Sequence, residues 1–264
     1  MSNLNILIVE GNDPKNNDFF IKAAKASCSE NLKNLVLKLE PSSVIKIINP
    51  SNDDQTKKAL ENIKNYHGII FTGGAMRLND MTDEIKKHIN FASSCYQYEN
   101  KILAICWGLQ VCSVAAGGKV APGKKGAHVG IASDIEINEE GRKNPIYKDK
   151  KLKFTSPAFN YDEVCEMPHG ATLLSSDKVN SVMGIHFTSG KSKVWGLQYH
   201  PDYEYWQMIN LSSARKDKII ENNHFDNEND FQKHLEFIKE EDKKLDFKNR
   251  TCEVKNWLDI IKIN

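Results

Sequence analysis

The chain has 264 residues, and its 36 basic side chains nearly balance its 35 acidic ones, for a formal net charge of +1. This balance argues against a nucleic-acid-binding or membrane-surface protein. The sequence has no long apolar span and no signal-peptide pattern, and its six cysteines lack paired CxxC spacing. We therefore expect a cytoplasmic protein with reduced thiols and no metal site.

The first 105 residues alternate short apolar runs with amphipathic segments. Strands are predicted at residues 5–10, 44–48, 68–72 and 102–105, and helices at 17–29, 55–65 and 82–96. Strands that alternate with helices predict a doubly wound, mostly parallel sheet with helices on both faces. In such sheets ligands bind at the carboxyl ends of the strands.

Beyond residue 119 the pattern changes to shorter strands separated by turns. They are predicted at about 130–137, 152–155, 171–175, 181–187 and 193–199, as an antiparallel extension of the sheet. The tail from Tyr203 is charged and helical, with Phe231, Leu235 and Ile238 at the spacing of a packed helix face. Residues 222–230 are predicted as a loop, which could lie over the mouth of a site.

Cys106 stands where a buried strand turns tightly into a helix. Four apolar residues, 102–105, precede it, and a Trp-Gly step opens the apolar helix that follows. The positive end of a helix favours a thiolate and can stabilise an oxyanion, so Cys106 is a candidate nucleophile. A buried structural cysteine is the alternative.

His200 ends the last strand and is followed by Pro201 and Asp202. A thiol nucleophile needs an imidazole to take its proton, and the imidazole needs an acceptor on its other nitrogen. Cys106, His200 and Asp202 supply these three groups.

Two segments around these residues carry a family resemblance. AICWGLQ (104–110) and GLQYHPD (196–202) resemble the nucleophile and His-Pro-Glu motifs of class I, triad-type glutamine amidotransferases. GIIFTGGAMRLND (68–80), AAGGKV (115–120) and YDEVCEMPHGATLLSSD (161–177) resemble further family segments in the expected order. The similarity is closest to free-standing GMP synthase-like members. It implies a flavodoxin-like amidotransferase domain over residues 1–210, with residues 211–264 as a helical extension packed on it.

The resemblance also implies roles for individual residues. Cys106 would be the nucleophile that forms a γ-glutamyl thioester, His200 the general base and then acid, and Asp202 the orienting carboxylate. The backbone N–H groups of Gly74 and Trp107 would form the oxyanion hole. Gln110 and Asn160 would face the substrate, and the family implies no cofactor.

Three positions depart from the family pattern. Ala104 replaces the usual glycine two residues before the nucleophile. Asp202 replaces the usual glutamate, with Glu204 as an alternative third member of the triad. Asn160 replaces a common histidine, so the substrate preference could differ from that of relatives.

The leading hypothesis is an enzyme that hydrolyses or transfers a γ-glutamyl amide bond of glutamine or of a γ-glutamyl amide or peptide. One alternative is a glutaminase subunit that delivers ammonia to a separate synthetase. Another is a non-catalytic descendant that binds a glutamyl ligand or a partner protein. The expected partner is a small γ-glutamyl molecule, with no nucleic acid and no membrane, and the oligomeric state is left open.

Overall fold

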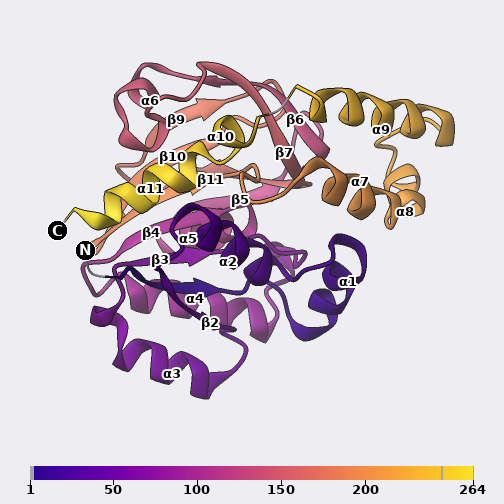
Figure 1. Cartoon of the computed structure of the whole chain (residues 1–264). Helices are drawn as coiled ribbons and strands as arrows, with labels where there is room; N and C mark the ends of the chain where they lie inside the picture. The colour runs from indigo at the N-terminus through magenta and orange to yellow at the C-terminus, as the bar shows by residue number, and fades with distance from the viewer. Residues whose placement is uncertain (1–2, 245, 264) are drawn as a thin grey trace.

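A nine-stranded sheet lies at the centre of the computed structural model, which describes residues 3–244 and 246–263 (Figure 1). Its strands are β1 (Asn5–Val9), β2 (Val44–Ile48), β3 (Gly68–Phe71), β4 (Lys101–Ile105), β6 (His128–Ile137), β7 (Lys153–Asn160), β9 (Thr172–Ser176), β10 (Gly184–Ser189) and β11 (Ser192–Leu197). They follow the order β2-β1-β3-β4-β11-β10-β9-β6-β7. The pairs from β2 to β11 are parallel, and those from β11 to β7 are antiparallel. The predicted parallel sheet with an antiparallel extension is confirmed.

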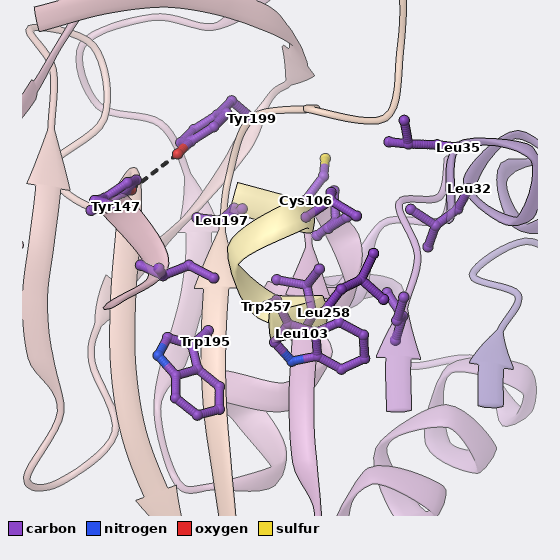
Figure 2. Close-up of a cluster of buried hydrophobic side chains, with 14 of the residues drawn as sticks. Leu32, Leu35, Leu103, Cys106, Tyr147, Trp195, Leu197, Tyr199, Trp257 and Leu258 are labelled. Carbon is purple, nitrogen blue, oxygen red and sulfur yellow. Dashed lines mark hydrogen bonds between the residues drawn. The ribbon is translucent and has the colours of Figure 1, made fainter. Parts of the chain in front are cut away.

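Helices cover both faces of the parallel half. On one face α2 (Cys28–Leu39) and α11 (Cys252–Lys262) pack on the sheet, and on the other α3 (Asp53–Glu61), α4 (Asp83–Cys95) and α5 (Trp107–Ala115) do so. The alternation of β1 produces these two layers, because Ile6 and Ile8 join the first cluster and Leu7 and Val9 the second. Figure 2 shows part of the first cluster, where Trp257 and Leu258 of α11 lie beside Leu103 of β4.

The first helices of the tail lie beside β6 and β7, at the antiparallel end of the sheet (Figure 1). α7 (Tyr205–Ser213) packs against α1 (Pro14–Ala24) and β6, and is followed by α8 (Lys216–Glu221) and α9 (Glu228–Asp242). The predicted apolar face of α9 is buried against β6 through Phe231, Leu235 and Ile238. α10 (Phe247–Arg250) then leads into α11.

The structure adds elements that the sequence did not predict. The helix expected at 17–29 ends at Ala24, where Lys25 takes a left-handed φ of 66°, and Ser27 then caps α2. A two-stranded sheet pairs β5 (Lys119–Pro122) with β8 (Asp162–Glu166). Short helical turns complete the fold: α6 (Glu139–Lys143), η1 (Ile63–Asn65), η2 (Leu78–Asp80) and η3 (Pro145–Tyr147). Across the described ranges, no helix has the length and apolar character needed to cross a bilayer.

Candidate active site

The parallel pairing of β4 and β11 brings Cys106 and His200 to one edge of the sheet. Ile105 lies opposite Leu197, and the Cys106 N–H donates to the Leu197 carbonyl at 2.7 Å. Parallel strands place their carboxyl ends at the same edge, so the residues that follow each strand become neighbours. β3, on the other side of β4, delivers Gly73 and Gly74 to this edge.

Cys106 has a strained backbone at the tip of the turn into α5. Its φ of 51° and ψ of −108° are unusual for a residue with a side chain. The turn is tight because α5 approaches β3 closely: a Cβ on Gly108 would lie 2.4 Å from the Phe71 carbonyl oxygen. The chain therefore holds the sulfur at the start of α5, where the helix dipole favours negative charge.

Besides the His200 ring, two further groups contact the Cys106 sulfur. Sγ lies 3.6 Å from the Phe159 carbonyl oxygen of β7, and the buried Gln198 amide donates to it at 3.5 Å. Gln198 was not among the predicted site residues. Its signal in the sequence is a polar side chain between Leu197 and Tyr199, both fully buried, at the end of a core strand.

His200 is fixed from three directions. Its Nδ1 lies 3.1 Å from Asp202 Oδ1, and its ring packs edge-on against Tyr203 with 5.0 Å between ring centroids. A Cβ on Gly73 would lie 2.5 Å from His200 Cε1, so the ring rests directly on the Gly73 backbone. These contacts leave the ring little room to move.

The electrostatics of this group couple the imidazole to the sulfur. Burial lowers the pKa of His200, but the charges of Cys106 and Asp202 and their hydrogen bonds to the ring outweigh it and raise the pKa to about 10. The protonated form of the ring is therefore favoured in spite of its burial.

Asp202, rather than Glu204, is the carboxylate beside His200. Glu204 is half exposed, with Oε2 2.8 Å from Trp206 Nε1 and Oε1 3.4 Å from the Arg250 guanidinium. The loop that carries Asp202 is held in place by hydrogen bonds to its backbone. Asn31 donates to the Asp202 carbonyl at 2.7 Å, and Arg250 to the flanking carbonyls of Pro201 and Tyr203 at 3.0 Å.

Gly74 and Trp107 both border the cavity into which Cys106 opens. The loop of Gly74 is held against the end of β1, where a Cβ on Gly74 would lie 2.6 Å from the Gly11 carbonyl oxygen. The next amide, of Ala75, donates to Asn12 Oδ1 at 2.7 Å. The loop backbone is thus fixed beside the cysteine turn.

Gln110 and Asn160 form an amide wall in the same cavity. Gln110 donates to the Asp162 carbonyl at 2.9 Å, and Asn160 donates to it at 3.1 Å. Asn160 Oδ1 lies 2.9 Å from His128 Nδ1, whose other ring nitrogen lies 2.8 Å from Asp177. Position 160 is therefore anchored through a buried polar chain.

The cavity has a volume of about 540 Å³ and includes residues of the tail in its wall. Arg215, Lys218 and His224 contribute to it, and His224 stacks on Tyr161 with 4.9 Å between ring centroids. Asn222 and His224 of the loop predicted at 222–230 therefore line the site, whereas residues 228–230 belong to α9 and not to the loop. Tyr203 lines the cavity, whereas Tyr205 is buried under α9 and Trp206 is exposed.

Within residues 3–244 and 246–263, no cluster of three or more His, Cys, Asp or Glu side chains could hold a metal ion.

The family model "Glutamine amidotransferase class-I" matches residues 21–208 of the chain. The chain belongs to this family. The match includes the three strand ends that build the site, and the family resemblance of the sequence is thereby confirmed.

Relatives within the family include hydrolases and a component of a synthase. The chain is 24% identical to a γ-glutamyl-L-1-hydroxyisopropylamide hydrolase from Pseudomonas sp., over 86% of this chain and 77% of that protein. It is 31% identical to a subunit of the glutamine-hydrolysing GMP synthase from Methanoregula boonei, over 52% of this chain and 66% of that protein. A glutamine amidotransferase structure from Thermotoga maritima has a TM-score of 0.71 at 16% identity and covers both chains completely, which supports the class I amidotransferase fold.

The Ala104 departure from the family pattern has a place in this fold. Ala104 is fully buried and lies opposite Gly196 of β11. A Cβ on Gly196 would meet Leu109 of α5 at 2.4 Å. The small residue at 196 therefore leaves the space under α5 that close packing of this turn requires.

Proposed function

We propose that the protein is a cysteine-dependent enzyme that hydrolyses, or transfers, the γ-glutamyl group of a γ-glutamyl amide. The observation that carries this proposal is the buried His200 imidazole, which lies 3.1 Å from Asp202, has its pKa raised by the neighbouring Cys106 and Asp202, and shares one cavity with Cys106. A relative that hydrolyses a γ-glutamyl amide, matched over most of both chains, supports the same reaction class.

The proposed reaction has two halves, acylation of Cys106 and hydrolysis of the thioester, and His200 transfers a proton in each. The Cys106 thiolate attacks the γ-carbonyl carbon, and the resulting oxyanion accepts hydrogen bonds from the Gly74 and Trp107 amides. The C–N bond then breaks as the His200 imidazolium gives its proton to the leaving nitrogen.

Water completes the cycle. Its oxygen attacks the γ-glutamyl thioester while neutral His200 takes a proton from it, and the C–S bond breaks to release glutamate. This step restores the thiolate and the imidazolium. Gln198, which donates to the sulfur at 3.5 Å, stabilises the thiolate before it attacks the substrate and again when the C–S bond breaks.

The cavity favours an enzyme that acts alone over a glutaminase subunit that delivers ammonia to a synthetase. Residues of α7, α8 and the loop after it, including Met208, Lys218 and Asn222, form part of the cavity wall. The chain thus covers its own site with segments that lie beyond residues 21–208 or at their end. The similarity to a subunit of GMP synthase supports the alternative, a glutaminase subunit that serves a synthetase.

The test is Cys106→Ala against a panel of glutamine, γ-glutamyl amides and γ-glutamyl peptides, with released glutamate and amine as the readout. We expect wild-type turnover on at least one compound and a loss of several orders of magnitude in the variant, because nucleophile, base and oxyanion donors act as one unit. Cys112→Ala is the matched control, since Cys112 lies on the same helix but is buried in the core. Full activity of Cys106→Ala would discard the mechanism.

The reactivity of the Cys106 thiol distinguishes the proposed enzyme from a non-catalytic, ligand-binding descendant. A thiolate held beside an imidazolium should react with iodoacetamide well below the pH at which an ordinary cysteine does. Alkylation of Cys106 with the pH profile of an unperturbed thiol would favour a ligand-binding descendant.

A further inference from the structure

Arg215 is a cation in the cavity wall, and no anionic partner for it stands among the described residues. It lies between α7 and α8, and its guanidinium faces three aromatic rings, at 4.5 Å from Phe19, 5.3 Å from Phe20 and 5.1 Å from Phe159. In the part of the chain that the structure describes, no carboxylate lies within ion-pair distance of it and its side chain makes no hydrogen bond to a protein acceptor.

Two other arginines of the chain, the half-exposed Arg77 and the buried Arg250, have oxygen acceptors. Arg77 forms a two-pronged pair with Asp162, and Arg250 donates to two backbone carbonyls and to Glu204. Burial lowers the pKa of Arg215, which reflects the cost of holding this charge away from water. Aromatic faces offset part of that cost, but they do not replace a carboxylate as acceptor for the N–H donors of the fork.

The charges around the cavity select an anionic ligand. Arg77, Arg215 and Lys218 contribute positive charge to the wall, and the carboxylate of Asp162 is already bound to Arg77. An anion that reaches Arg215 would therefore meet an uncompensated guanidinium in a partly dehydrated setting, where a carboxylate pairs with the planar fork most effectively.

Arg215 stands apart from the amide wall proposed for the glutamyl group. It contacts Phe159 of β7, whose carbonyl oxygen lies 3.6 Å from the Cys106 sulfur, together with Phe19 and Phe20 of α1. Gln110 and Asn160 instead converge on the Asp162 carbonyl. A substrate whose γ-carbonyl sits at the sulfur can therefore extend one end to the amide wall and the other to the guanidinium.

We propose that Arg215 binds a carboxylate on the leaving group, so that the preferred substrates are γ-glutamyl amino acids or γ-glutamyl peptides with a free carboxylate. This inference rests on the proposed function and names the substrate class of the same site. Neutral leaving groups, including ammonia from glutamine, would leave the guanidinium unsatisfied and be cleaved less efficiently.

The test compares γ-glutamylglycine with γ-glutamylglycinamide, which differ only in the terminal carboxylate. We expect Arg215→Met to lower kcat/KM for γ-glutamylglycine by about 10- to 100-fold, mainly through KM, and to change the value for the amide by less than about 3-fold. Arg215→Lys should restore part of the preference. Arg142→Met, at an exposed arginine outside the cavity, is the control and should leave both substrates unaffected.

An equal loss on both substrates would overturn the proposal, because Arg215 would then serve the glutamyl half or the packing of the fold. A shift in melting temperature of the variant without a change in the substrate ratio would overturn it as well. The failure of the proposed function is a separate result, in which wild type cleaves no γ-glutamyl compound. Calorimetric binding of γ-glutamylglycine to wild type, tighter than that of the amide and dependent on Arg215, would still support the carboxylate site in that event.

Discussion

At the scale of single residues, the site depends on the charges that Cys106 and Asp202 place beside His200. The His200 ring is buried, which by itself would favour its neutral form, yet the pKa is raised to about 10 by Cys106 and Asp202. The imidazolium is needed to protonate the leaving nitrogen in the proposed reaction. As the pH rises through this value, the ring loses its proton and acylation should slow.

Asp202→Asn tests this balance. Removal of the carboxylate charge lowers the pKa of His200, so the alkaline limb of the kcat/KM profile should move to lower pH by about one unit or more. The rate at the optimum should also fall, because an amide can hold the imidazole in the wrong tautomer. The measurement is a pH–rate profile of both proteins on one substrate. An unchanged alkaline limb would show that Asp202 does not set the charge of His200.

The site residues that could be predicted from the sequence are those that lie within a short, recognisable motif. Cys106 and His200 stand directly after apolar strands, and their neighbours identify the turn and the strand end. Gln198 and Arg215 have no such local signal. Their roles come from contacts with Cys106 and with three phenylalanine rings, which depend on how distant segments fold together.

At the scale of elements, three parallel strand ends assemble the site without long side chains to bridge them. β3 contributes backbone alone at Gly73, and the His200 ring after β11 rests on it. The position of the imidazole is therefore set by the closeness of two strand ends. A glycine is needed there for its missing side chain rather than for an unusual φ.

Gly73→Ala should displace the imidazole while the sheet remains folded. The added Cβ would lie 2.5 Å from His200 Cε1, so the ring must move away from the position that the sulfur and Asp202 define. We expect kcat/KM to fall by about 100-fold, the cost of a displacement of order 1 Å in a catalytic group. Steady-state kinetics with a melting curve as control measure both effects. Wild-type kinetics in this variant would mean that the glycine does not position the ring.

The order of strands and helices could be predicted because the apolar periodicity differs between them. The split between α1 and α2 could not, since it depends on the left-handed Lys25 and the Ser27 cap inside one amphipathic run. The pairing of β5 with β8 joins segments about 40 residues apart, and neither segment has a periodicity strong enough to mark it as a strand.

At the scale of the whole molecule, the last helix is tied to the strand that carries His200. Glu253 of α11 accepts a hydrogen bond from Tyr199 at 2.6 Å and pairs with Lys150 at 3.0 Å, both deep in the core. The Tyr199 hydroxyl oxygen also lies 3.0 Å from that of Tyr147, a hydrogen bond that the dashed line in Figure 2 marks. Residues of the predicted extension, 211–264, thus stabilise the backbone next to the proposed general base. Its standing as a separate unit stays a prediction.

Glu253→Gln should destabilise the whole fold, because it leaves the Lys150 ammonium buried without its counter-charge. Both side chains are at most 1% exposed, and breaking such a pair costs about 3 kcal/mol or more in the free energy of unfolding. The double variant Lys150→Met/Glu253→Gln should recover part of this loss, since no charge is then stranded. Asp259→Asn is the matched control on the same helix: its pair with Lys255 is about half exposed, and we expect a change of less than about 0.5 kcal/mol. Urea unfolding of wild type and the three variants measures these changes in the free energy of unfolding. Equal effects of Glu253→Gln and Asp259→Asn would contradict an anchoring role for the buried pair.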